Sequence, residues 1–182
     1  MRVIAGAYKG RTLAPVKGRT RPTAAKVREA IFNILGSAVA GARVLDLYAG
    51  TGALGIEALS RGARAAVFVE DHPEALQVLR RNLESLGLLA QATVLPLAVL
   101  AALKKLASRS EPFDLVFLDP PYGGVAAVAT LAALGSSELL RPQARVVAEH
   151  SKRESLPALG GRLTLKDLRR YGDTQVAFYL AE

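Results

Sequence analysis

Residues 43–70, RVLDLYAGTGALGIEALSRGARAAVFVE, decide the fold of this 182-residue chain. The apolar run 43–48 predicts a buried strand, and the glycine turn after it leads into a predicted helix over 53–61. A second apolar run over 65–70 predicts the next strand. This order predicts a βαβ unit, because two parallel strands need a crossover connection between them.

The alternation of strands and helices continues downstream of this unit. Further strands are expected near 93–95, 114–118 and 145–149, and helices from Pro73 to Leu86, over 98–108 and over 125–134. Two last strands, 162–168 and 175–181, form a hairpin. The sequence therefore predicts an α/β fold with a doubly wound, mostly parallel sheet and an antiparallel C-terminal strand. Ahead of it we expect an extension made of a short β-hairpin within 1–15 and a helix over 23–35.

Positive charge is concentrated at the start of the chain. The chain has 24 Lys and Arg against 16 Asp and Glu, and +7 of its net charge of +8 falls in residues 1–40. Clustered cations bind polyanions by displacing counterions from phosphates, so residues 1–40 are interpreted as a nucleic-acid contact. A solvated basic surface is the alternative. The expected contact residues are Arg2, Lys9, Arg11, Lys17, Arg19, Arg21 and Arg28.

Composition excludes several classes of protein. With 51% apolar and 22% charged residues the chain can bury a full core, which excludes intrinsic disorder, and the lack of cysteine excludes zinc ribbons and thiol nucleophiles. Residues 1–26 lack the pattern of a secretory signal, so we expect a cytoplasmic protein. The uncharged stretch 86–103 contains Gly87 and Pro96 and is expected to hold a loop, a strand and a helix start rather than a membrane span.

A glycine motif indicates a nucleotide-like ligand. Gly50, Gly52 and Gly55 form G-x-G-x-x-G directly after the first predicted strand, where glycines let the backbone approach a ligand closely. Glu70 ends the second predicted strand, where its carboxylate can accept hydrogen bonds from both ribose hydroxyls. The motif therefore predicts a nucleoside-bearing cofactor and leaves NAD, FAD and S-adenosylmethionine open.

Two further features favour S-adenosylmethionine. Asp46 ends the first strand, where it can meet the amino group of an amino-acid tail, which NAD lacks. The segment Asp119-Pro120-Pro121-Tyr122 follows the fourth strand at the edge where doubly wound sheets bind ligands. Its two prolines fix a rigid pair of carbonyl acceptors suited to a planar NH2 group, and Tyr122 offers a face for stacking a base. An ordinary Pro-Pro turn with a buried tyrosine is the alternative.

Three parts of the chain resemble the RsmD family, bacterial methyltransferases that methylate the exocyclic N2 of one guanine in 16S ribosomal RNA. They are residues 44–58 (VLDLYAGTGALGIEA), 114–122 (DLVFLDPPY), and the opening MRVIAGAYKGRTL with RPTAAKVREAIFNIL at 21–35. The glycine and DPPY motifs also occur in DNA adenine-N6 and glutamine-N5 methyltransferases. The N-terminal block makes the resemblance specific, and the resemblance covers essentially the whole chain.

The resemblance implies a Rossmann-like class I methyltransferase fold that uses S-adenosyl-L-methionine and modifies 16S rRNA or the small ribosomal subunit. It implies that 1–40 contacts RNA, that 41–182 binds the cofactor and catalyses, and that Asp119 to Tyr122 hold the target guanine. The expected cofactor-binding residues are Asp46, Tyr48, Gly50, Thr51, Gly52, Gly55, Glu70 and Asp71. No metal or membrane partner is expected, and a monomer is favoured.

Some residues depart from this pattern or leave alternatives open. Leu97 stands where such enzymes usually carry Asp or Asn for the adenine ring, and Glu149 is interpreted as structural. Arg169 and Arg170 could extend the RNA surface or belong to a solvated edge. Two other functions remain open: adenine-N6 methylation of DNA or RNA, for which the chain lacks room for a target-recognition domain, and a non-catalytic RNA-binding or assembly factor on a methyltransferase scaffold.

Overall fold

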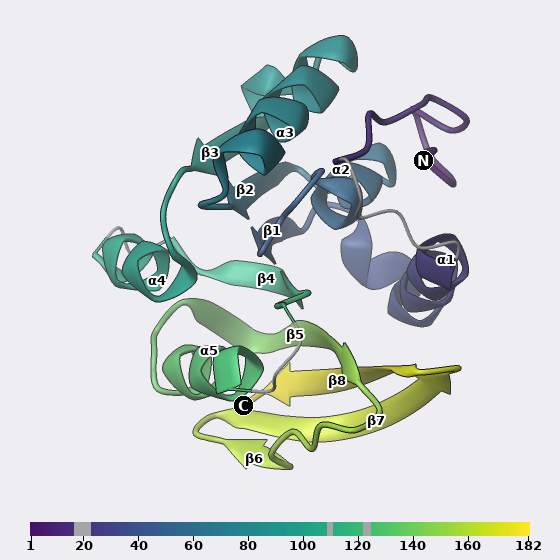
Figure 1. Cartoon of the computed structure of the whole chain (residues 1–182). Coiled ribbons are helices and arrows are strands. Elements are labelled where there is room, and N and C mark those ends of the chain that lie inside the picture. The colour runs from purple at the N-terminus through teal and green to yellow at the C-terminus, as the bar shows by residue number, and fades with distance from the viewer. Residues whose placement is uncertain (17–22, 109–110, 122–124) are drawn as a thin grey trace.

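A twisted sheet runs through the molecule, with helices on both of its faces (Figure 1). The structure is a computed structural model that describes residues 1–16, 23–108, 111–121 and 125–182. In this part of the chain eight strands pair in the order β3-β2-β1-β4-β5-β8-β7-β6. They are β1 (Arg43–Leu47), β2 (Ala65–Val69), β3 (Ala92–Leu95), β4 (Phe113–Leu118), β5 (Leu140–Ser151), β6 (Leu159–Gly160), β7 (Leu163–Tyr171) and β8 (Thr174–Ala181).

Strands β1 to β5 are parallel, and β8 lies antiparallel beside β5. This confirms the predicted doubly wound sheet and its antiparallel C-terminal strand. The connecting helices are α1 (Thr23–Leu35), α2 (Ala53–Ser60), α3 (Pro73–Ser85), α4 (Val99–Ala107) and α5 (Val125–Gly135), with short 3-10 helices η1 (Gly36–Val39) and η2 (Leu89–Gln91).

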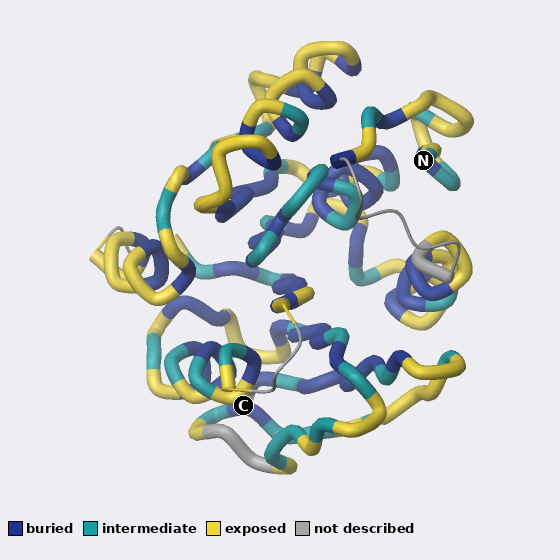
Figure 2. The backbone as a smooth tube through the Cα atoms, in the orientation of Figure 1, coloured by how far each residue is buried: buried dark blue, intermediate teal, exposed yellow. Residues whose placement is uncertain are grey.

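The alternation of side chains along the strands divides the core into two layers. In β1, Val44 joins the core under α1, α2 and α3, whereas Leu45 and Leu47 join the core under α4 and α5. Asp46 therefore shares the face of Val44, toward α2. Strand β1 is buried over nearly its whole length (Figure 2), so both faces of the parallel sheet are covered.

The C-terminal hairpin is confirmed, but it extends the sheet further than expected. Strand β8 pairs with β5, and β7 and then β6 follow it outward. The sequence prediction missed β6 and limited the fifth strand to 145–149, because Pro142 and Gln143 interrupt the apolar pattern. Gln143 has a φ of 67°, and the β4–β5 pairing shifts register beside Phe113.

The predicted short N-terminal hairpin is confirmed. Arg2 and Thr12 form an antiparallel bridge, and the N–H groups of Val3 and Leu13 donate to the carbonyls of Arg11 and Met1 at 3.0 and 2.8 Å. The backbone between the two arms also bonds to side chains of α2. The N–H groups of Ile4 and Ala5 donate to Glu57, at 2.8 and 3.0 Å. The extension thereby becomes part of the main body, and its apolar side chains Val3, Leu13 and Val27 join the core under α1 to α3.

The uncharged stretch 86–103 contains η2, β3 and the start of α4, as the sequence predicts. Among the residues that the structure describes, no helix has both the length and the apolar character needed to cross a membrane.

Candidate active site

A pocket of about 190 Å³ opens at the carboxyl ends of β1, β4 and β5. It brings together five residues predicted to bind cofactor or substrate, namely Asp46, Tyr48, Gly50, Thr51 and Asp119. Arg28 and Glu149, which the sequence assigned to other roles, line the same pocket. The lining does not include six other predicted site residues that the structure describes, and Tyr122 falls outside the described residues; the six are Gly52, Gly55, Glu70, Asp71, Pro120 and Pro121.

The three glycines of the motif have different physical roles. A Cβ on Gly52 would meet Leu79 at 2.4 Å, and a Cβ on Gly55 would meet the Phe68 ring at 2.3 Å. These two glycines therefore allow α2 and α3 to pack closely on the sheet. Gly50 has a φ of 56°, which favours glycine, and a Cβ there would meet nothing closer than 3.9 Å. Gly50 is the motif glycine that lines the pocket.

The side chain of Glu70 fixes the glycine loop by a hydrogen bond to its backbone. Its side chain is only 7% exposed, and its Oε2 accepts the N–H of Gly50 at 2.8 Å. The other oxygen, Oε1, accepts the N–H groups of Asp71 and His72 at 3.0 and 2.9 Å. The carboxylate thus holds the ends of β1 and β2 together, and Oε2 keeps a lone pair for a further donor.

Asp46 is a buried carboxyl at the floor of the pocket. Its Oδ2 accepts the N–H of Gly55 at 2.8 Å, and the residue is 2% exposed. The pKa of Asp46 is raised from 3.8 to about 8, mainly by burial and to a smaller extent by the negative charges of Asp119 and Glu70, while the hydrogen bond from Gly55 opposes the rise. A cationic ligand that enters the pocket supplies a counter-charge and favours the ionised form of this carboxyl.

This raised pKa predicts that Asp46→Asn stabilises the ligand-free protein. Between pH 3.8 and about 8 the unfolded chain gains free energy by ionising Asp46 and the folded chain does not, so the parent's stability falls across that window. Asparagine does not titrate and keeps an acceptor for Gly55. The variant's advantage in free energy of unfolding should exceed about 1 kcal/mol at the top of the window and vanish at its acid end. Urea unfolding across this range measures it, and a pH-independent difference would contradict it.

The segment after β4 brings an acceptor group to the pocket. Asp119 is exposed and lines the pocket, while Pro120 behind it is buried. Tyr48, which has a φ of 60°, closes a neighbouring part of the wall, with its hydroxyl 2.8 Å from Thr130 Oγ1 on α5. Tyr48 is thereby tied to the helix that follows the DPPY segment.

Glu149, which the sequence analysis interpreted as structural, lines the pocket. Leu118 of β4 pairs with Ala148 of β5, so the next residues, Asp119 and Glu149, emerge side by side at the carboxyl edge. The one feature of the sequence that indicated this position was that Glu149 ends the strand predicted over 145–149. The pocket therefore carries two acidic side chains from neighbouring strands in addition to Asp46.

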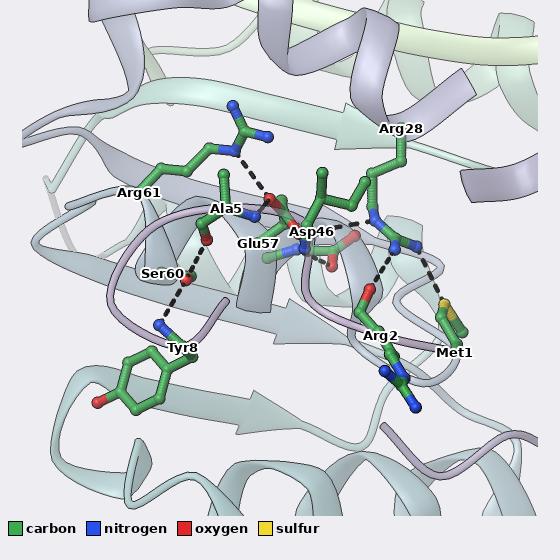
Figure 3. Close-up of polar contacts among 11 residues, drawn as sticks. Met1, Arg2, Ala5, Tyr8, Arg28, Asp46, Glu57, Ser60 and Arg61 are labelled. Carbon is green, nitrogen blue, oxygen red and sulfur yellow. Dashed lines mark hydrogen bonds and ion pairs between the residues drawn. The ribbon is translucent and has the colours of Figure 1, made fainter. Parts of the chain in front are cut away.

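The expected RNA-contact residues fall into three groups. Arg2, Lys9 and Arg11 are exposed, whereas Lys17, Arg19 and Arg21 lie outside the described residues. Arg28 differs from the expectation: it is 4% exposed and faces the interior, because α1 packs that side against α2 (Figure 3). Burial lowers its pKa from the usual value of arginine, and the charge of Glu57 opposes this shift.

Several residues with open interpretations also have a defined place. Arg169 and Arg170 are exposed on β7, and Leu97 packs against the core under α4 and α5. No cluster of three or more potential metal ligands occurs in the described ranges.

The chain is similar to known proteins along its whole length. The family model described as "Conserved hypothetical protein 95" matches residues 1–180. The "Putative rRNA methyltransferase YlbH" of Bacillus subtilis is 43% identical over 98% of either chain. The "Ribosomal RNA small subunit methyltransferase D" of Escherichia coli is 32% identical over 100% of this chain and 90% of that protein.

A solved structure with a bound ligand is also similar. The T. thermophilus 16S rRNA N2 methyltransferase RsmC, in complex with AdoMet and guanosine, superposes with a TM-score of 0.72. It is 26% identical, and the match covers 91% of this chain and 44% of that one. This likeness confirms the Rossmann-like class I methyltransferase fold that the sequence resemblance implied.

Proposed function

Because the chain belongs to the ribosomal RNA small subunit methyltransferase D family, we propose that it methylates the N2 amine of a guanine in 16S rRNA with S-adenosylmethionine. The observation that carries this proposal is the convergence of Asp119, at the end of β4, and the Gly50 loop, at the end of β1, in one pocket. An acceptor for a nucleobase amine and a cofactor loop then lie within reach of each other.

The residues at the Gly50 loop fit S-adenosylmethionine. Glu70 is a buried carboxylate beside Gly50 that keeps a lone pair for a ribose hydroxyl, and Asp46 is a buried carboxyl suited to a cationic group. When bound, the cofactor supplies an electrophilic methyl group on a sulfonium. Leu97 offers no polar side chain for the adenine ring, so we infer that backbone groups near the end of β3 recognise it.

Asp119, through its side-chain carboxylate, and Pro120, through its carbonyl oxygen, activate the amine by accepting hydrogen bonds from its two N–H groups. The lone pair of a nucleobase NH2 is delocalised into the ring, and two acceptors on its protons favour the pyramidal form in which the lone pair is available. The nitrogen then forms the new N–C bond as the C–S bond breaks, and the proton that the nitrogen loses passes to water. Catalysis comes from positioning and preorganised acceptors, so no strong base is required.

The pair Asp119 and Glu149 supports guanine over adenine as the target. Guanine presents two neighbouring donors on its Watson–Crick edge, N1–H and the N2 amine, and acidic acceptors complement both. Adenine presents its amine beside the N1 lone pair, which a second carboxylate repels. The guanosine-bound structure of the related RsmC enzyme supports the same choice.

We further propose that residues 1–40 contact the RNA while 41–182 bind the cofactor and catalyse. Arg2, Lys9, Arg11 and Lys26 are the exposed cations of the described part of this extension. Their neighbours Met1 and Arg28 reach the pocket, so the extension also links the RNA surface to the cofactor site.

The role of Glu70 predicts a loss of cofactor affinity in Glu70→Ala. Removing the carboxylate releases the Gly50 loop and removes an acceptor for the ribose. Binding of S-adenosylhomocysteine should therefore weaken by about 1–3 kcal/mol. Glu70→Gln keeps one acceptor oxygen and should lose less. Calorimetry measures both, and unchanged affinity in both variants would remove Glu70 from the site.

Transfer of labelled methyl groups tests the proposed function. Small ribosomal subunits and large subunits from a strain that lacks the gene are each incubated with the protein and methyl-labelled cofactor. We expect label in 16S rRNA and none in the large-subunit RNA. Absence of both label and S-adenosylhomocysteine binding would favour the non-catalytic assembly factor instead.

A further inference from the structure

Arg28 is a buried cation whose hydrogen bonds are incomplete. It lies on α1 at 4% exposure, and one Nη atom donates to the carbonyl of Arg2 at 2.6 Å. The other Nη lies 3.0 Å from the sulfur of Met1, and a thioether is a weak acceptor. Its Nε has no hydrogen-bond partner among the described residues (Figure 3). Buried donors of this kind are rare, because leaving them unpaired costs free energy.

The neighbouring carboxylate does not fully compensate this charge. Glu57 approaches Arg28 Nε at 3.8 Å, which is an ion pair without a hydrogen bond. Its oxygens are occupied by closer partners, the N–H groups of Ile4 and Ala5 and the Nε of Arg61 at 2.8 Å. One carboxylate thus serves two arginines, and an excess positive charge remains on the Arg28 side.

This excess charge faces the cofactor pocket. Arg28 lines the pocket with Asp46, Gly50 and Met1, so an anionic group there can reach a desolvated guanidinium. An anion in this place replaces the weak sulfur acceptor by charge-assisted hydrogen bonds. The pocket also contains Asp46, which is suited to a cation, so it offers complements for both charges of an amino acid.

We propose that Arg28 binds the carboxylate of the cofactor's amino-acid tail, while Asp46 receives the tail's amino group. This rests on the proposed use of S-adenosylmethionine and replaces the expectation that Arg28 contacts RNA phosphates. Arg28 also donates to the carbonyl of Arg2, so the residue that binds the tail also holds the N-terminal segment against the pocket.

The test compares two ligands that differ by the tail. S-Adenosylhomocysteine carries the amino-acid tail, and 5′-methylthioadenosine carries the same nucleoside without it. In Arg28→Met, affinity for S-adenosylhomocysteine should fall at least about tenfold, while affinity for 5′-methylthioadenosine stays within about twofold of the parent's. Arg61→Met is the matched control, because Arg61 pairs with the same Glu57 but lies outside the pocket lining. It should change neither affinity.

Each other outcome decides against the proposal. Equal losses for both ligands would make Arg28 a purely structural residue, and unchanged binding of both would remove it from the site. If Arg28→Met loses only RNA affinity, Arg28 is an RNA-contact residue, as the sequence analysis expected. If the parent binds neither ligand, the proposed function itself fails.

A crystal structure of the unaltered protein with S-adenosylhomocysteine gives the same test without a variant. We expect a guanidinium nitrogen of Arg28 within hydrogen-bond distance of a tail carboxylate oxygen. A carboxylate bound elsewhere would overturn the assignment even if the variant cannot be folded.

Discussion

Replacing Asp119 by alanine should slow methyl transfer at least about a hundredfold and leave cofactor affinity unchanged. The acceptor acts on the reacting amine, so its loss raises the barrier of the chemical step. The fold should persist, because Asp119 is exposed at the end of β4. Single-turnover transfer to small subunits measures the rate, and calorimetry with S-adenosylhomocysteine measures the affinity.

Two further variants make this result specific. Asp119→Asn keeps an acceptor oxygen and should retain more activity than the alanine variant. Asp173→Ala removes an exposed carboxylate that pairs with Lys152 between β7 and β8, and it should have no effect. Near-normal turnover of Asp119→Ala would overturn the role assigned to the DPPY segment.

Neutralising four cations of the N-terminal extension should weaken RNA binding by about 10–100-fold near physiological salt. The set is Arg11, Lys17, Arg19 and Arg21, of which Arg11 is exposed and the other three lie outside the described residues. If each contacts one phosphate, the slope of log affinity against log salt should fall by about 3. Affinity for S-adenosylhomocysteine should survive, because none of the four belongs to the pocket lining.

A control with the same loss of charge separates contact from bulk electrostatics. Lys104, Lys105, Arg153 and Lys166 are exposed cations on α4, after β5 and on β7. Their replacement should leave the salt slope nearly unchanged. Equal losses in both sets would mean that the extension is only a solvated basic face, and the RNA surface would then be sought first at Arg169 and Arg170.

Local patterns in the sequence predicted most of the fold. Helix α1 was predicted with its observed bounds, because its apolar stripe at helical spacing is bounded by Pro22 and Gly36. The alternation from β1 to β5 followed from apolar runs of strand length. The N-terminal hairpin was predicted, but its packing on α2 was not, because the backbone of residues 4–8 donates to side chains of α2 that are distant in sequence.

In the candidate site, too, only features carried by adjacent residues could be predicted. The glycine loop, Asp46 and the DPPY segment carry their chemistry in adjacent residues, so their meeting at one sheet edge could be predicted. Arg28 and Glu149 reach the pocket only through helix packing and strand register, and neither is encoded in a local motif. Charge counting treated Arg28 as a surface cation, because composition does not report which face of a helix is buried.

The identity of the methylated nucleoside tests the central claim most directly. Small subunits that lack the modification are treated with the protein and labelled cofactor, and their 16S rRNA is digested to nucleosides for mass spectrometry. We predict that the label appears in N2-methylguanosine and that the Asp119→Ala variant produces almost none. Label in N6-methyladenosine would contradict the account of Asp119 and Glu149 as acceptors for guanine.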